Sequence, residues 1–182
     1  AHGGYPVEQA SCSACHNPHS STQAKLLKAS VHAPVAGTQC DTCHPDPGSA
    51  KPFEATQKGS DLCFACHDAA GVKGAGKVQH LPFKEGECLV CHGPHASENP
   101  KLLKSKGNDL CVSCHTEKQT AVVFAHAPVA AEEGCLSCHG AHSSDNERLL
   151  TTKPSDLCAS CHADTKAAAQ KSIVPMRTPP TL

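Results

Sequence analysis

The sequence is poor in the large side chains that usually build a hydrophobic core. Its 182 residues include no Trp, one Tyr, four Phe and one Met. With 13 Gly and 14 Pro residues, long helices and inner strands are not expected. A chain of this size with so few aromatic side chains must obtain its buried apolar surface from another source.

Neither charge nor a long hydrophobic run suggests a nucleic-acid or membrane-spanning protein. The formal net charge is -1, with 16 basic and 17 acidic side chains, so we expect no nucleic-acid binding. No apolar run approaches the roughly 18 residues that cross a bilayer. The sequence starts at Ala1 with no apolar leader, and we expect a mature exported protein whose signal peptide has been removed.

What the sequence does contain is 14 Cys and 14 His, and every Cys belongs to a Cys-x-x-Cys-His motif. Numbered 1 to 7 along the chain, these motifs are Cys12-Cys15-His16, Cys40-Cys43-His44, Cys63-Cys66-His67, Cys88-Cys91-His92, Cys111-Cys114-His115, Cys135-Cys138-His139 and Cys158-Cys161-His162. This is the attachment signature of c-type haem, and it predicts seven covalently bound haem c groups.

The spacing has a chemical reason. Two thiols must each form a thioether with one vinyl group of the same haem, and a gap of two residues places both sulfurs on one side of a helical turn. The adjacent His then supplies an axial imidazole nitrogen to the iron. The fourteen Cys are therefore the predicted haem-binding residues, and the seven motif His are the predicted proximal iron ligands.

Three other chemistries use paired cysteines, and each fits less well. Disulfide geometry does not require a His after every second Cys. Structural zinc sites use Cys-x-x-Cys pairs, but they do not need seven His at one fixed offset. A thioredoxin-like motif occurs once in a βαβ fold rather than seven times.

The motifs recur in pairs with a period of 46 to 48 residues. Type A motifs (1, 2, 4 and 6) follow a His that is often near a Pro, and type B motifs (3, 5 and 7) follow a polar-Asp-Leu signal, as in Ser60-Asp61-Leu62. We predict that Ser60, Asn108 and Ser155 cap the helices that carry the type B motifs. The predicted repeats, within one heptahaem domain, are 1–31 (repeat 1, with one motif), 32–79 (repeat 2), 80–125 (repeat 3) and 126–165 (repeat 4), followed by a Pro-rich tail at 166–182.

Three type A motifs carry a further His three residues on, at His19, His95 and His142, and each is followed by a double Leu. Motif 2 lacks both features and reads His44-Pro45-Asp46-Pro47. Residues 68–79 are rich in Gly and Ala and are expected to form a linker.

Seven His remain beyond the proximal ligands, which equals the predicted number of irons. They are the predicted second axial ligands: His2, His19, His32, His80, His95, His126 and His142. The counts suggest that the upstream His serve type A haems and the downstream His serve type B haems, with His19 on the third haem. His2 could bind in its own chain or in a neighbouring one, and Met176 is a further candidate ligand.

The repeated motifs resemble those of multihaem c-type cytochromes with doubled Cys-x-x-Cys-His motifs, over nearly all of the chain up to about residue 165. The resemblance implies an exported electron carrier, periplasmic or extracellular, in a family with some members that polymerise into filaments. It also implies a fold that is mainly irregular with short α-helices, an extended multihaem array with very little or no β-sheet.

These observations lead to several functional expectations. The first is a conductor of electrons along closely spaced bis-His haems, either as an extracellular filament that grows head to tail or as a periplasmic shuttle. The second is the haem subunit of a porin–cytochrome conduit, not itself membrane-spanning. A redox enzyme is less expected, because the His count closes every iron. Partners would be redox proteins or extracellular electron acceptors.

Overall fold

The computed structural model describes residues 2–73, 76–119 and 126–163. Its α-helices are short: α1 (Ala33–Ala36), α2 (Gly59–Phe64), α3 (Ala69–Lys73), α4 (Leu81–Lys84), α5 (Cys88–Cys91), α6 (Asn108–Val112), α7 (Ala127–Ala130) and α8 (Pro154–Cys161). Single 3-10 turns lie at His2–Gly4, Val7–Gln9, Cys12–Ala14, Ala24–Leu26, Cys40–Thr42, Pro100–Leu102, Thr116–Gln119, Gly134–Ser137 and Glu147–Leu149. In α1, α4 and α7 a Pro near the start favours the first turn, where its missing N–H costs nothing.

Sheet structure is limited to two antiparallel pairs of two-residue strands within the described ranges. Strand β1 (Ser30–Val31) pairs with β3 (Ala96–Ser97), and β2 (Val78–Gln79) pairs with β4 (Ser143–Ser144). Each pair joins the residues before one repeat's first helix to the loop after the type A motif of the following repeat. The prediction of a mainly irregular fold with short helices and very little sheet is confirmed.

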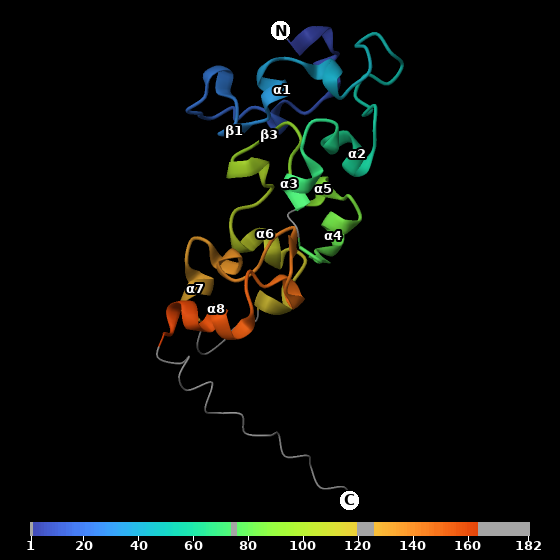
Figure 1. Ribbon diagram of the computed structural model, residues 1–182. Coiled ribbons are helices and arrows are strands. Elements are labelled where there is room, and N and C mark those ends of the chain that lie inside the picture. The colour runs from blue at the N-terminus through green and yellow to red at the C-terminus, as the bar shows by residue number, and fades with distance from the viewer. Residues whose placement is uncertain (1, 74–75, 120–125, 164–182) are drawn as a thin grey trace, which may run out of the picture.

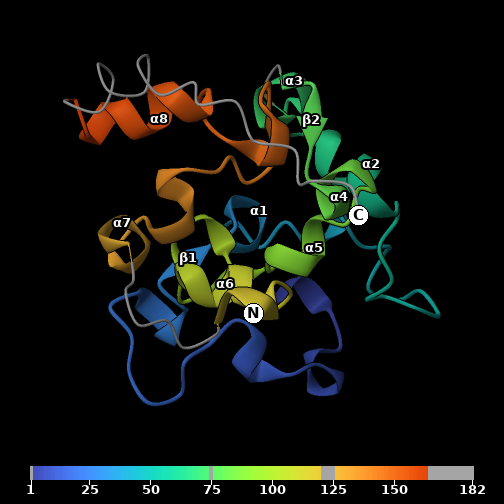
Figure 2. The same ribbon diagram turned by 90° about the horizontal axis from the view of Figure 1, so that it is seen from below.

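The described chain is elongated, and the repeats follow one another along it (Figure 1). Repeat 1, in blue, lies at one end of the molecule, and repeat 4, in orange and red, lies at the other. Figure 2 looks along this long axis and shows short helices joined by loops rather than layers of secondary structure. None of the described helices is long and apolar enough to cross a membrane.

The polypeptide provides almost no core of its own. Among the described residues, the buried hydrophobic side chains are Tyr5 and Ala96, each 8% exposed, and no large side chain is fully buried. The Tyr5 ring lies near Phe53 and His44, and its hydroxyl donates to the Pro45 carbonyl at 2.8 Å. A chain with so few buried contacts needs bound groups to fill the space between its loops.

The predicted caps of the type B helices are wrong. Helices α2, α6 and α8 follow Lys58, Gly107 and Lys153 at the capping position, without a side-chain cap. The Asn108 amide is instead engaged between repeats, where it donates to the Val129 carbonyl and accepts from the Cys135 N–H. Tertiary partners outcompete the local cap at this position.

The expected linker at 68–79 is also structured where it is described. The Asp68 carboxylate accepts from the N–H groups of Ala70 and Gly71 and so stabilises the first turn of α3. Val78 and Gln79 then form β2. The Pro-rich tail at 166–182, with Met176, lies outside the described residues.

Candidate haem sites

All seven motifs adopt the same local turn. In each one the N–H of the motif His donates to the carbonyl of the first Cys at 2.9–3.0 Å, which folds the two thiols and the imidazole round a single turn. All fourteen thiols are free, so the disulfide alternative is not realised in this structure. The arrangement suits two thioether bonds and one axial nitrogen, as the sequence predicts.

A backbone clamp orients the proximal His in three of the type A motifs. The Nδ1 atoms of His16, His92 and His139 donate to the carbonyls nine residues on, at 2.8, 2.9 and 2.8 Å. The accepting residues are Lys25, Lys101 and Arg148, and each has a positive φ of 56° to 60°, as has the Leu that follows it. This conformation is costly for a non-glycine residue, and here it aims the carbonyl at the imidazole. With Nδ1 engaged, Nε2 is left to bind iron.

Motif 2, which lacks the double Leu, has a weaker version of the clamp. The His44 Nδ1 atom lies 3.4 Å from the Glu54 carbonyl, one residue farther along than in the other type A motifs. The Thr56 N–H still donates to the Cys43 carbonyl, as Lys28 does to Cys15. The longer loop therefore preserves the orientation of the proximal imidazole with a looser contact.

Six of the seven motif His face a second imidazole. Ring centres are 5.8–6.1 Å apart in the pairs His2–His16, His44–His95, His32–His67, His92–His142, His80–His115 and His126–His162. Because a metal–imidazole bond is about 2 Å long and the ring centre lies about 1 Å farther out, two imidazoles on one metal have centres about 6 Å apart. The ring spacing thus leaves room for one metal between each pair, and the residues fit bis-His haem.

The pairing predicted from the counts agrees with the structure at motif 1, where the upstream His2 faces His16, and is wrong at the other motifs. The upstream His32, His80 and His126 face the type B motifs of their own repeats, not the type A motifs. The downstream His95 and His142 face the type A motif of the preceding repeat. The β1–β3 and β2–β4 pairings explain this, because they lay the loop after each type A motif against the repeat before it.

Motif 1 is served by a third source. The following repeat has Pro47 where a downstream His would stand, and His2 takes that place opposite His16, with ring centres 6.1 Å apart. His2 has a φ of 63°, held in the 3-10 turn His2–Gly4. The departure of motif 2 from the repeat pattern is therefore compensated by a His near the start of the sequence.

Two His remain without a facing imidazole among the described residues. His19 is exposed and was expected to serve the third haem, but His32 lies there instead. His139 keeps its clamp to Arg148, yet no second imidazole faces it. One spare imidazole and one proximal His that lacks a facing ring are thus left over, at opposite ends of the molecule.

The downstream His are the best enclosed of the predicted second ligands. Burial lowers the pKa of His95, with His44 and His32 adding to the effect, and burial likewise lowers the pKa of His142. The His142 Nδ1 atom donates to the Val72 carbonyl of α3 at 3.1 Å, and Phe83 of α4 stacks on the ring with centres 4.8 Å apart. Sequence reasoning missed Phe83, although it stands where the other His-x-Pro segments have Val35 and Val129.

Thiols of successive motifs lie close together. Burial and, to a lesser degree, the neighbouring Cys88 thiol of the next motif raise the pKa of the Cys63 thiol to about 11. Burial and the Cys135 thiol likewise raise the pKa of Cys111. The Cys40 thiol likewise raises the pKa of Cys15, the Cys66 thiol that of Cys43, and the Cys114 thiol that of Cys91. Since these sulfurs would carry the haem edges, successive haems from motif 1 to motif 6 have their attachment points side by side.

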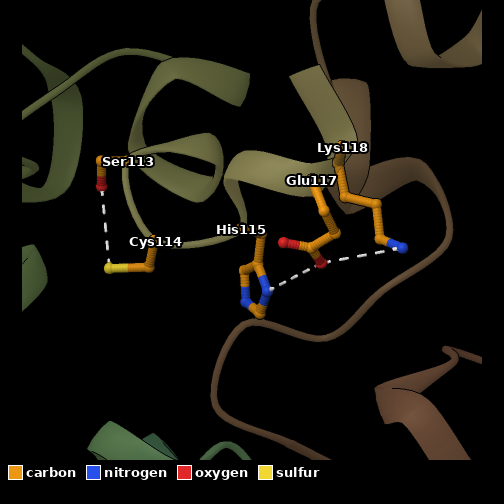
Figure 3. A network of polar contacts seen from close by, with 5 residues as sticks. All are labelled: Ser113, Cys114, His115, Glu117 and Lys118. Atoms are coloured by element: carbon orange, nitrogen blue, oxygen red, sulfur yellow. Dashed lines mark hydrogen bonds and ion pairs between the residues drawn. The ribbon is translucent and has the colours of Figure 1, made fainter. Parts of the chain in front are cut away.

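A carboxylate lies near the proximal His of motif 5 (Figure 3). The Glu117 Oε1 atom is 3.9 Å from His115 Nδ1 and 3.7 Å from Lys118 Nζ. All three side chains are more than half exposed, so water screens the interaction. The carboxylate can make the imidazole a slightly stronger donor to iron.

Known proteins agree with the chemistry of the motifs. The family described as "Doubled CXXCH motif" matches residues 5–31, 32–72, 80–120 and 126–167. No curated protein matches the chain. The four matches cover most of the sequence, and the motifs they share indicate several covalently bound haem c groups.

Proposed function

The chain belongs to the family of multihaem c-type cytochromes with doubled CXXCH motifs, which are exported electron-transfer proteins, and from this premise we propose that it conducts electrons along seven haems. Each haem is bound by the two Cys of one motif, with the motif His as proximal ligand. The second ligands are the facing His of the six pairs, and the seventh iron is considered below.

The observation that carries the proposal is the set of facing imidazoles. Their 5.8–6.1 Å spacing recurs six times, in motifs that follow one another along the long axis. At 26 residues for each motif, the polypeptide is too thin to separate neighbouring haems. When haem c is bound it supplies reversible one-electron chemistry at iron, and the protein's residues fix its ligands and spacing.

The roles of the chain's own groups follow from their hydrogen bonds. Backbone carbonyls accept from Nδ1–H of His16, His92 and the downstream His142, which leaves Nε2 of these imidazoles available to iron and fixes their orientation. Two imidazoles on one iron leave no position for substrate, so the six paired sites serve electron transfer rather than catalysis. We therefore propose a carrier and not an enzyme.

Location and assembly form the finer part of the proposal. The elongated array suits entry of electrons at one end and exit at the other, and we propose an extracellular protein that polymerises head to tail. A periplasmic shuttle or the haem subunit of a porin–cytochrome conduit are the alternatives. The acceptors would be redox proteins or extracellular oxidants that approach an exposed end.

The test is to purify the holo-protein and count its haems by intact mass. We expect seven haem additions, low-spin spectra for at least six haems, and filaments in negative stain. Single filaments bridging two electrodes should carry current that is lost when the protein is stripped of iron. A bare chain or a zinc protein would refute the haem assignment, whereas monomers at all concentrations would refute only the filament.

A further inference from the structure

Repeats 2 and 3 are joined by a loop that carries an iron ligand and two further hydrogen bonds. The His95 ring faces His44, with centres 5.8 Å apart. The His95 carbonyl accepts from the N–H of His32 at 2.9 Å, and the Pro94 carbonyl accepts from His32 Nδ1 at 3.0 Å. The same loop therefore places a ligand on motif 2 and orients the ligand of motif 3.

The joint between repeats 3 and 4 is built in the same way. The His142 ring faces His92, with centres 6.1 Å apart. The His142 carbonyl accepts from the His80 N–H at 2.9 Å, and the Ala141 carbonyl accepts from His80 Nδ1 at 3.2 Å. A rule holds at both joints: the downstream His of one repeat serves the type A motif of the repeat before it.

Repeat 1 carries the same loop, but its downstream His faces no second imidazole among the described residues. The His16 backbone is bridged to Leu27, as His92 is to Leu103, and Ser21 Oγ donates to the Leu27 carbonyl as Ser97 Oγ does to Leu103. His19 stands at the ligand position of this loop and is exposed. The loop is thus folded like the two loops that present a ligand, but the site for its ligand lies outside its own repeat.

Repeat 4 contains the site that such a ligand would complete. His139 is clamped to Arg148 like the other type A ligands but faces no second imidazole among the described residues. His126 faces His162, yet in the part of the chain that the structure describes its N–H and Nδ1 lack the carbonyls that serve His32 and His80. All fourteen His of the sequence are described, and His19 and His139 are the two that remain unpaired. Figure 1 places their repeats, 1 and 4, at opposite ends of the molecule.

We propose that His19 of a second copy of this chain is the second axial ligand of the haem iron at motif 6, where Cys135 and Cys138 attach the haem and His139 is the proximal ligand. In the same joint, the His19 and Pro18 carbonyls of that copy accept from the N–H and Nδ1 of His126. This inference rests on the haem binding proposed above.

The joint extends the rule of the two internal joints across the boundary between copies. At one end of every assembly a His19 is left without an iron, and at the other end a motif 6 iron is left without a second ligand. The interface is therefore heterologous, and it adds copies in a line rather than closing a dimer.

The test uses the full holo-protein and follows spin state against concentration. In dilute protein we expect one haem in seven to be high-spin and to bind carbon monoxide after reduction. On concentration this haem should become low-spin, in step with the appearance of oligomers in light scattering. H19A should keep one high-spin haem at every concentration and stay monomeric, and added imidazole should make that haem low-spin without restoring assembly.

Two further variants make the result specific. H95A should add a second high-spin haem. This haem should persist at high concentration, because the ligand removed comes from the same chain and a second copy cannot replace it. His19→Met, which keeps a ligand at the same place, should restore assembly and raise the potential of one haem.

Three results would overturn the inference. In the first, dilute wild-type protein has seven low-spin haems, as it would if Met176 ligated the seventh iron within one chain. In the second, the assembled protein still binds one carbon monoxide for every chain rather than one for every assembly, which would make motif 6 a small-molecule site. In the third, H19A assembles normally. A haem count below seven by mass would instead refute the proposed function, so the two failures are distinguishable.

Discussion

The loop after motif 4 and the loop after motif 1 have nearly the same sequence and local fold but different surroundings. His92-Gly93-Pro94-His95 lies against repeat 2, where Ala96 and Ser97 are buried in the β1–β3 pairing. In His16-Asn17-Pro18-His19 the last His is exposed, and so is Ser20. The comparison teaches that the local sequence builds the loop, whereas contact with a neighbouring repeat decides whether its His faces a second imidazole.

The largest expected effect is the difference between removing His95, which faces a second imidazole, and removing His19, which does not. In dilute protein, H95A should make one additional haem high-spin and lower the free energy of unfolding by roughly 2–4 kcal/mol, because an iron ligand and a half-buried contact are lost together. H19A should change neither quantity. Chemical denaturation and low-temperature paramagnetic resonance of the two variants would check this.

Equal losses of stability in H95A and H19A would contradict the comparison, since they would mean that both loops are engaged within one chain. Ser20→Ala, a change in the exposed loop next to His19, is the matched control. It should leave spin state and stability as in the wild type.

The next largest effect is a dependence of the free energy of unfolding on pH, which arises from the half-buried His95 and His142. Because burial lowers the pKa of His95 and His142 below the ordinary 6.5, the unfolded chain takes up protons before the folded one as pH falls. The free energy of unfolding should therefore be constant above about pH 7 and should decrease as pH falls below 6.5.

Denaturation curves between about pH 5 and pH 8 would measure this. His95→Met keeps an iron ligand that does not titrate in this window, so it should flatten part of the decrease. An unchanged slope in this variant would show that His95 does not contribute to the pH dependence.

A smaller effect is expected where the two internal joints differ. Phe83 stacks on His142 at 4.8 Å, while the corresponding residue of repeat 2 is Val35. Phe83→Val should lower the free energy of unfolding by about 1 kcal/mol through loss of the aromatic pair. The control is Val129→Leu at the same place in repeat 4, which is 48% exposed and should leave the isolated chain unchanged. Denaturation of both variants by urea would compare them.

The smallest effect is expected at motif 5. Glu117→Gln removes a charge 3.9 Å from His115 Nδ1 and should raise the potential of one haem by roughly a few tens of millivolts at most. The shift should shrink with salt, because the side chains are exposed. Protein-film voltammetry at two ionic strengths would measure it, and a shift independent of salt would contradict this explanation.

The sequence predicts some of these features and not others, for physical reasons. The motif turns and the irregular fold are local, so the Cys spacing and the Gly and Pro content are sufficient to predict them. The partners of His32 and His95 depend on the β1–β3 pairing between repeats, which a count of His cannot resolve. Asn108 illustrates the same limit: its local sequence favours a helix cap, but the tertiary contact to Cys135 prevails.

The most direct test of the central claim is an experimental structure of the holo-protein at a resolution that shows the axial ligands. We predict His95 on the iron of the haem attached to Cys40 and Cys43, and His142 on the iron of the haem attached to Cys88 and Cys91, so that each downstream ligand crosses to the preceding repeat. If instead His32 and His80 were bound to these two irons, the joints between repeats would not carry ligands, and this account of the array would be wrong.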